Sequence, residues 1–169
     1  MNEDHGDGEP GKDKTTSRQE VSRRTYLKIG SIAALGAGGS RAAMSEAAAA
    51  TNEPFGGSAR TIPGRIEAED FDTGGEGGSY HDTTTSNKGG SYRDTAVDIE
   101  PVDDDTGKYN VGWIRDGEWL AYTVDVTEPD STYTVQFRVA GKNESASIDV
   151  SLGGESLGTV DVPDTGEWQ

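Results

Sequence analysis

The sequence predicts an all-β fold, a β-sandwich of jelly-roll type, from two observations. After residue 62, apolar residues recur at every second position in several short runs, which is the period of a strand with one buried face. The runs are separated by Asp, Asn, Pro and by many of the 24 glycines of the chain, the residues typical of turns. No helical period is present past residue 51, so short strands joined by turns favour a sandwich or jelly roll.

The stretch 111–126 is the clearest of these patterns. It holds two of the three tryptophans, and Asp116-Gly117 predicts a tight turn before a strand that starts near Trp119. One face of that strand should carry its apolar side chains, namely Leu120, Tyr122, Val124 and Val126. Further strands are predicted at 66–71, 97–100, 133–139, 146–152 and 157–162, and the alternation is cleanest at 133–139.

Charge divides the chain in two. Residues 1–50 contain equal numbers of acidic and basic residues, so the whole net charge of −16 belongs to the rest. An acidic surface of this kind disfavours nucleic acid and anionic lipid as partners, and it is typical of proteins adapted to high salt. The chain has no cysteine, so disulfides are excluded.

The first 50 residues predict a lead-in followed by an export signal. Residues 1–20 are polar and lack apolar periodicity, and the segment Ser22-Arg23-Arg24-Thr25-Tyr26-Leu27-Lys28 precedes a short uncharged run and an alanine-rich stretch. This layout resembles a twin-arginine signal peptide carried by Arg23 and Arg24, with cleavage expected within Ala47–Ala50. A basic amphipathic helix is the alternative. We expect a linker at 51–61, a module at 62–169, secretion, and no membrane contact after cleavage.

Sites for chemistry are few. The sequence has no serine-hydrolase, zinc-protease or phosphate-loop motif, and the pair His81-Asp82 is typical of a surface loop. Glu67 and Glu69 share one face of the predicted strand at 66–71, where two carboxylates need either solvent or a cation, and Ca²⁺ prefers oxygen ligands.

The aromatic residues have two possible roles, packed core or platforms for a ligand. Trp113 lies just before a predicted turn, and Trp168 lies among Gly, Asp and Glu. Flat rings at loops beside carboxylates and amides suit sugars, because a ring packs on the apolar face of a pyranose while polar groups take its hydroxyls.

Seven segments of the sequence together resemble family 6 carbohydrate-binding modules. They include Ile66-Glu67-Ala68-Glu69-Asp70-Phe71, Tyr109-Asn110-Val111-Gly112-Trp113-Ile114, Gly117-Glu118-Trp119-Leu120-Ala121-Tyr122-Thr123-Val124 and Pro163-Asp164-Thr165-Gly166-Glu167-Trp168-Gln169. The resemblance covers about residues 62–169 and implies a jelly-roll β-sandwich without catalytic activity, attached to secreted polysaccharide-degrading enzymes.

The resemblance also implies roles for single residues. Trp113 and Trp168 match the two aromatic walls of a sugar-binding cleft, and Glu100 matches a carboxylate that binds sugar hydroxyls. Glu67 and Glu69 match ligands of a structural Ca²⁺, whereas Trp119 and Tyr122 match core positions. The family continues past the Trp-Gln pair, so we expect the module to be C-terminally incomplete.

These observations predict a monomeric, exported, non-catalytic module that binds a polysaccharide or oligosaccharide and forms part of a secreted glycoside hydrolase. The alternative is a cell-surface adhesion domain with the same sandwich and no enzyme.

Overall fold

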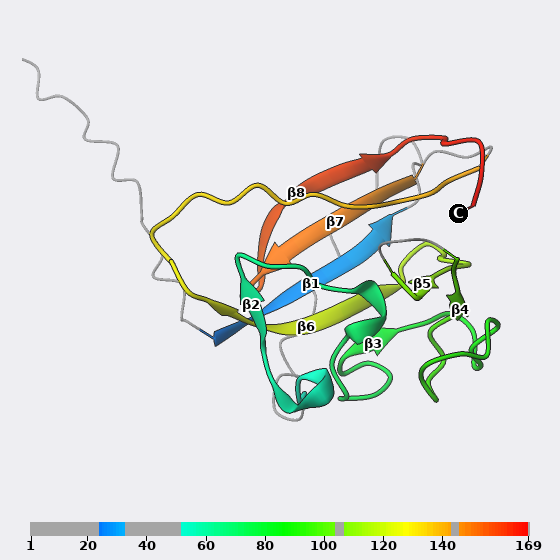
Figure 1. The fold of residues 1–169 in the computed structure, drawn as a ribbon, viewed down its shortest axis with the longest axis horizontal. Helices are drawn as coiled ribbons and strands as arrows, with labels where there is room; N and C mark the ends of the chain where they lie inside the picture. Colours follow the sequence, from blue (N-terminus) through cyan, green and yellow to red (C-terminus); the bar gives the residue numbers. More distant parts are fainter. Residues whose placement is uncertain (1–23, 33–51, 104–106, 143–145, 169) are drawn as a thin grey trace, which may run out of the picture.

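The computed structural model describes residues 24–32, 52–103, 107–142 and 146–168, and within these it is all-β. Its larger sheet has six strands in the order β2-β6-β1-β7-β8, with β3 paired to β6 beside that path. These are β1 (Arg24–Ile32), β2 (Arg60–Ile62), β3 (Tyr80–His81), β6 (Trp119–Val126), β7 (Ala146–Leu152) and β8 (Glu155–Val162). All ladders are antiparallel except β2 with β6 (Figure 1).

A second, two-stranded sheet pairs β4 (Ile99–Pro101) with β5 (Tyr109–Val111). Two short 3-10 helices complete the described elements, η2 (Phe55–Gly57) and η3 (Ala68–Asp70). No described helix is long and apolar enough to cross a membrane.

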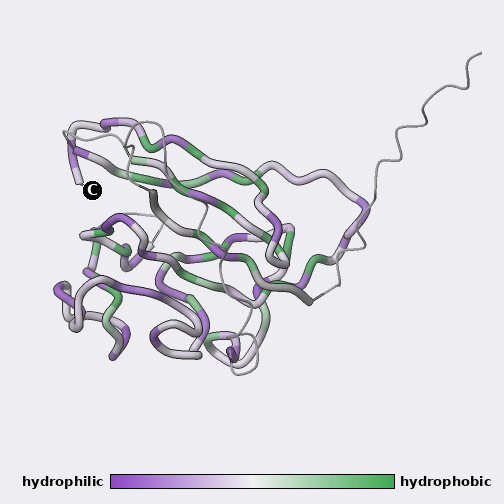
Figure 2. The backbone as a smooth tube through the Cα atoms, turned by 180° about the vertical axis from the view of Figure 1, so that it is seen from behind, coloured by the Kyte–Doolittle hydropathy of each residue, from purple (hydrophilic) through white to green (hydrophobic). Residues whose placement is uncertain are grey.

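The hydrophobic core lies between the larger sheet and a layer built from η3, β4 and the loops around them. The sheet contributes Tyr122 and Val124, both almost completely buried, and the opposite layer contributes Phe71 and Ile99. Hydrophobic stretches run along the strands of the sheet, while most of the connecting loops are hydrophilic (Figure 2). The all-β prediction is therefore confirmed, and the two packed layers agree with a β-sandwich.

The predicted strands at 119–126, 146–152 and 157–162 correspond to β6, β7 and β8, and Ile99 begins β4. The core face of β6 is also as expected, because Tyr122, Val124 and Val126 are buried and Leu120 packs against the same cluster. The turn at Asp116-Gly117 is present, closed by a hydrogen bond from Glu118 N to Arg115 O. It joins two different sheets, since β5 pairs with β4 and not with β6.

Two predicted strands are wrong. Residues 133–139 form no ladder with any described strand, although Tyr133 and Phe137 pack against the core as the alternation implies. Residues 66–71 contain the 3-10 helix η3 in place of a strand. In both segments apolar side chains pack against the core without strand pairing. Burial requires only that the side chains point inward, whereas a strand also requires hydrogen bonds to the edge of a neighbouring strand.

The sheet also contains a segment that the sequence assigns to the export signal. Strand β1 lies between β6 and β7, with Leu27 buried in the core (Figure 1). Arg23 and the expected cleavage segment Ala47–Ala50 lie outside the described residues, and Arg24 is described only through its backbone, as the first residue of β1.

Candidate functional site

Two of the predicted sugar-binding residues, Trp113 and Glu100, lie at the turn that leaves β5. Trp113 follows β5 after one residue, Gly112. It has 48% of its surface exposed and takes a left-handed backbone conformation with φ of 48°. A non-glycine residue in this region is strained, and such strain is found mainly where a function requires a particular orientation. The ring of Trp113 is therefore held outward, away from the core.

Glu100 lies on β4 next to this turn. Its partner in the β4–β5 ladder is Asn110. Gly112, which precedes Trp113, donates a backbone hydrogen bond to Asp98 O at 2.9 Å and so holds the start of the turn beside β4. A Cβ placed on Gly112 would lie 3.8 Å from Glu100 Oε1 and 3.7 Å from Asn110 Oδ1. The two acceptor side chains thus meet beside the backbone of the tryptophan turn.

Asn110 is a site residue to which the sequence analysis assigned no role. Its side-chain oxygen is buried and accepts no hydrogen bond, whereas most buried polar atoms in proteins are paired. The sequence offered one signal, an amide residue directly before the Val-Gly-Trp run, but a strand position alone does not reveal an unpaired oxygen.

The turn after Trp113 is anchored by a buried carboxylate. Glu118 Oε2 accepts a hydrogen bond from Arg115 N at 2.8 Å, and its Oε1 accepts two from Thr83, from N at 3.0 Å and from Oγ1 at 2.6 Å. Glu118 is only 8% exposed, so these bonds compensate its burial and hold the turn in one shape. A pre-shaped turn reduces the entropy that a ligand loses on binding.

Trp168 lies in the turn that follows β8. Its ring is 62% exposed, and the turn is tied to Gly141 by hydrogen bonds to and from Thr165, among them Thr165 N to Gly141 O at 2.7 Å. The C-terminal segment lies at the same end of the long axis as the β4–β5 sheet (Figure 1). Trp113 and Trp168 make no ring contact with each other.

Trp119 has a different position. It is half-buried within β6, and the ammonium group of Lys28 from β1 lies 3.3 Å from the centre of its ring. Burial lowers the pKa of Lys28. Together with the fully buried Tyr122, which donates a hydrogen bond to Ala68 O at 2.9 Å, Trp119 serves as scaffold.

The two residues predicted to bind metal, Glu67 and Glu69, lie in different surroundings. Glu67 forms an ion pair with Arg65 at 2.8 Å, whereas Glu69 is 5% exposed inside η3. Burial raises the pKa of the Glu69 carboxyl, and the nearby charges of Glu67 and Asp70 raise it further. Within the described ranges, no three acidic or histidine side chains gather in the geometry of a metal site.

The turn at residues 69–72, called the acidic turn below, is held by the half-buried Arg93. Arg93 donates hydrogen bonds to the carbonyls of Glu69, Phe71 and Asp72 at 3.0, 2.6 and 3.2 Å. Its guanidinium also lies between the rings of Phe55 and Phe71, 4.1 and 4.0 Å from their centres. Such a planar cation can satisfy several carbonyls and stack on aromatic faces at once. Burial lowers the pKa of Arg93.

Next to Arg93, Tyr92 links the acidic turn to β5. Its ring packs on Tyr109 with 4.7 Å between centroids, and its hydroxyl donates to Asp70 Oδ1 at 2.5 Å. Burial and then the Asp70 carboxylate raise the pKa of Tyr92 to about 12. Asp70 also pairs with Arg60 at 3.1 Å, so its charge is compensated.

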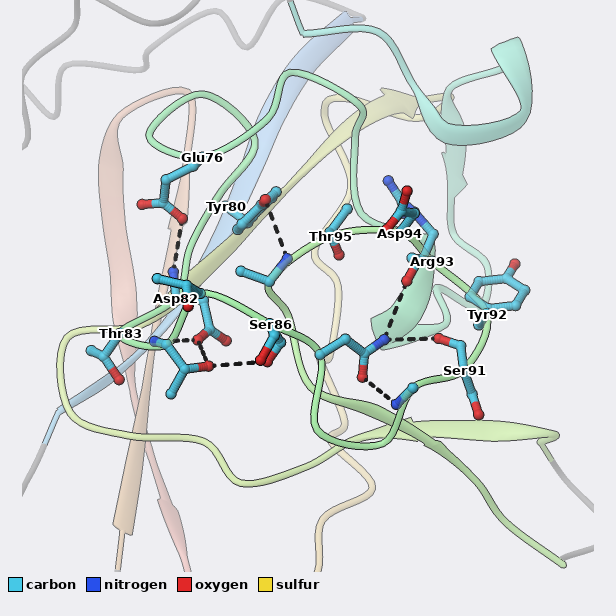
Figure 3. Close-up of a pocket in the computed structure, with 15 residues that line it drawn as sticks. Glu76, Tyr80, Asp82, Thr83, Ser86, Ser91, Tyr92, Arg93, Asp94 and Thr95 are labelled. Carbon is cyan, nitrogen blue, oxygen red and sulfur yellow. Dashed lines mark hydrogen bonds between the residues drawn. The ribbon is translucent and has the colours of Figure 1, made fainter.

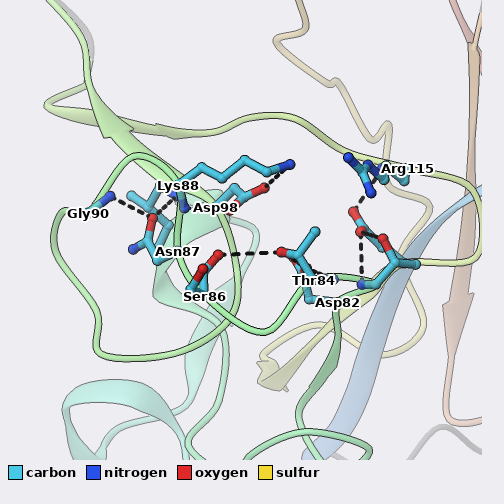
Figure 4. Close-up of polar contacts among 11 residues, drawn as sticks. Asp82, Thr84, Ser86, Asn87, Lys88, Gly90, Asp98 and Arg115 are labelled. Atoms are coloured by element: carbon cyan, nitrogen blue, oxygen red, sulfur yellow. Dashed lines mark hydrogen bonds and ion pairs between the residues drawn. The ribbon is translucent and has the colours of Figure 1, made fainter.

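A hollow of about 930 Å³ is lined mainly by residues 82–96 (Figure 3). Its walls are rich in hydroxyl groups and carboxylates, but many of these bind one another, as Asp82 does with Thr84. Neither tryptophan of the predicted cleft lines it. Asn87 closes its loop with four hydrogen bonds, and the Asp98 carboxylate beside it accepts from Lys88 N at 2.6 Å (Figure 4). We therefore interpret this hollow as a result of how these loops pack on one another and not as the ligand site.

Comparison with known proteins agrees with the predicted resemblance. Residues 89–169 match the family described as carbohydrate binding module (family 6). A relative is the clotting factor G alpha subunit of Tachypleus tridentatus, 39% identical over 76 residues, which are 43% of this chain and 11% of that protein. The chain therefore spans a small part of the length of this relative. The family match includes Glu100, Asn110, Trp113 and Trp168 and so confirms, over residues 89–169, that the chain resembles the family 6 carbohydrate-binding modules.

Proposed function

We propose that the module binds a polysaccharide or oligosaccharide through the turn of Trp113, with Trp168 as the second aromatic wall. The observation that carries the proposal is the meeting of two groups at one turn: an outward tryptophan in a strained conformation and the Glu100 carboxylate. An aromatic face with acceptors beside it matches a sugar, which has an apolar ring face and hydroxyl donors at its edge.

Affinity electrophoresis against xylan, β-glucan and agarose tests this proposal. We expect a polysaccharide in the gel to retard the full chain, and Trp113→Ala or Trp168→Ala to abolish most of that retardation. Leu157→Ala is the matched control, since Leu157 is 57% exposed on β8, away from this turn. Unchanged retardation in both tryptophan variants would show that the rings are not the platform.

The proposed setting is secretion through the twin-arginine route, as part of a glycoside hydrolase. The sequence motif at Arg23 and Arg24 supports export, and the family resemblance supports an attached enzyme. A cell-surface adhesion domain uses the same site without an enzyme. Fractionation separates the two: the adhesion role predicts the chain on the cell surface, and the hydrolase role predicts it in the medium together with polysaccharide-degrading activity.

We further propose that Glu69, together with Glu67, holds a structural Ca²⁺. Glu69 suits a cation, because its carboxylate is buried among other negative charges that the nearby Arg65 offsets only in part. Glu67 would have to share its charge with Arg65. Backbone carbonyls of the same turn are suitable further ligands for a hard cation.

A thermal melt with and without a chelator tests the metal. Calcium at 100 times its dissociation constant should stabilise the fold by about 2.7 kcal/mol, a shift of several degrees. Glu69→Gln should remove the shift, and Glu53→Gln, at an exposed position, should keep it. A melting temperature that ignores both calcium and chelator rules this site out.

A further inference from the structure

Strand β1 alone connects the β7–β8 hairpin to the rest of the larger sheet, as far as the described ladders show. It pairs with β6 over seven residue pairs and with β7 over six, whereas β6 and β7 do not pair with each other. Strands in a sheet are about 4.8 Å apart, so without β1 the edges of β6 and β7 would face each other across roughly 10 Å. Each edge would then expose a row of unpaired backbone groups.

The side chains show that β1 is closely fitted to this space. Leu27 is buried in the core, and Ile29 packs against the same cluster. Gly30 faces Trp119 so closely that an added Cβ would lie 3.3 Å from the Cβ of the tryptophan and 3.4 Å from Glu118 O. The ammonium group of Lys28 lies over the indole ring of the same tryptophan. The space between β6 and β7 therefore fits a strand that has apolar side chains toward the core and a glycine opposite Trp119.

The segment that fills the space is far from its partners in sequence. Nineteen residues, 33–51, lie between β1 and the next described segment, which begins at residue 52. The strand partners of β1 are residues 119–125 and 147–152. No tight hairpin turn holds it beside either neighbour. In this respect β1 resembles an added strand of the kind by which proteins bind extended peptides.

The same segment carries the second arginine, the leucine and the lysine of the proposed export motif. A central strand has both backbone edges bonded, so it cannot be bound elsewhere as an extended peptide at the same time. From these observations we propose that the space between β6 and β7 is a strand-binding site that holds the chain's own leader segment, Arg24–Ile32, so that release of the leader requires the sheet to open.

The strand-binding half of this proposal is tested with the full chain carrying a protease recognition sequence within residues 33–51. After folding and cleavage, we expect the N-terminal fragment to stay bound through native mass spectrometry and gel filtration, with the amides of β6 and β7 protected from hydrogen exchange. Immediate loss of the fragment with unchanged protection in β6 and β7 would overturn the proposal.

A matched pair of variants probes the fit. Gly30→Val places methyl groups against Trp119 and should speed fragment release at least tenfold, whereas Gly36→Val, the same change outside β1, should not. Equal release rates in the two variants count against a fitted site.

A cross-link provides a measurement that does not depend on cleavage. Ile29 and Leu120 are direct partners in antiparallel strands, and the natural chain has no cysteine, so Ile29→Cys with Leu120→Cys should form a disulfide that retains the fragment until reduction. Failure to cross-link in the folded chain contradicts β1 as a central strand.

The leader half is tested separately. Arg23→Lys with Arg24→Lys should stop export while the cleaved fragment remains bound to the sheet. If these changes leave export intact, the segment is not a twin-arginine leader and that half of the proposal fails. The carbohydrate site is tested separately by the tryptophan variants, because the changes at Arg23 and Arg24 alter no residue of the Trp113 turn.

Discussion

At the scale of single residues, the fold depends on buried charges that are compensated by hydrogen bonds. Asp72 is 1% exposed, and its two carboxylate oxygens accept from Thr123, from N at 2.9 Å and from Oγ1 at 2.7 Å. These bonds connect the acidic turn to the centre of β6. Arg93 connects the same turn to the loop before β4, so the layer that carries the proposed sites is fastened to the sheet by polar groups.

Asp72 makes the stability of the fold depend on pH. Burial raises its pKa above the ordinary value of 3.8, although the bonds from Thr123 oppose the shift. A carboxyl whose pKa is higher in the folded chain binds protons more tightly there, so its contribution to the free energy of unfolding falls as pH rises from about 3.8 through the folded value. Asp72→Asn removes this pH-dependent contribution to the free energy of unfolding.

Urea melts of the natural chain and of Asp72→Asn across pH 4 to 7 measure the effect. The difference in unfolding free energy between them should change in favour of the variant as pH rises. Asp103→Asn, at an exposed position, should follow the natural chain. A constant difference between Asp72→Asn and the natural chain would mean that Asp72 titrates alike in the folded and unfolded states.

Arg93→Lys is expected to lower the free energy of unfolding by about 2–3 kcal/mol. An ammonium group has neither the planar fork nor the stacking surface needed for three carbonyls and two rings, so buried acceptors lose their partners. Arg138→Lys at an exposed position should change the free energy by less than about 0.5 kcal/mol. Chemical denaturation compares the two, and equal values would show that Arg93 contributes no more to stability than the exposed Arg138.

At the scale of elements, the site depends on how closely the loop before β4 approaches that strand. A Cβ on Gly89 would lie 2.0 Å from Ile99 O and 2.8 Å from Glu100 N. This contact leaves no room for a side chain, so the backbone of β4 is positioned directly by the glycine.

Gly89→Ala should therefore displace β4 and Glu100, reducing both sugar retardation and the free energy of unfolding, the latter by about 1–3 kcal/mol. Gly90→Ala is the neighbouring control. Nothing lies within 4 Å of its Cβ position, so its left-handed φ of 61° should cost about 1–2 kcal/mol while retardation remains. Weaker binding in Gly90→Ala than in Gly89→Ala would contradict this account of the loop.

The elements also show what the sequence could predict. Strands β6, β7 and β8 follow from local alternation, although β8 exposes every residue except Val162. Residues 133–139 have the same alternation and no ladder, since pairing depends on a free edge elsewhere in the chain. Strand β1 could not be foreseen, because its glycine- and alanine-containing surroundings match an export signal and its partners lie far along the sequence.

In the candidate site, Glu100 and the two tryptophans were predicted from motif resemblance, whereas the unpaired oxygen of Asn110 could be recognised only in the structure.

At the scale of the whole molecule, the excess of negative charge is the dominant property. The net charge of −16 lies entirely in residues 51–169, where most acidic side chains are on loops and strand surfaces. Like charges packed on a small domain repel one another in the folded state more than in the expanded unfolded chain. Few basic residues are present to offset this repulsion.

Salt should therefore stabilise the module. The Debye length falls from about 10 Å at 0.1 M to about 3 Å at 1 M, which screens most of the repulsion between neighbouring surface carboxylates. We expect the melting temperature to rise steeply between these concentrations of sodium chloride and then to level off. A variant with six exposed carboxylates changed to amides, at Glu128, Asp130, Glu155, Asp161, Asp164 and Glu167, should start higher and rise less. If the two proteins respond to salt in parallel, the stabilisation comes from a general salt effect on apolar burial, because that contribution does not depend on the number of carboxylates.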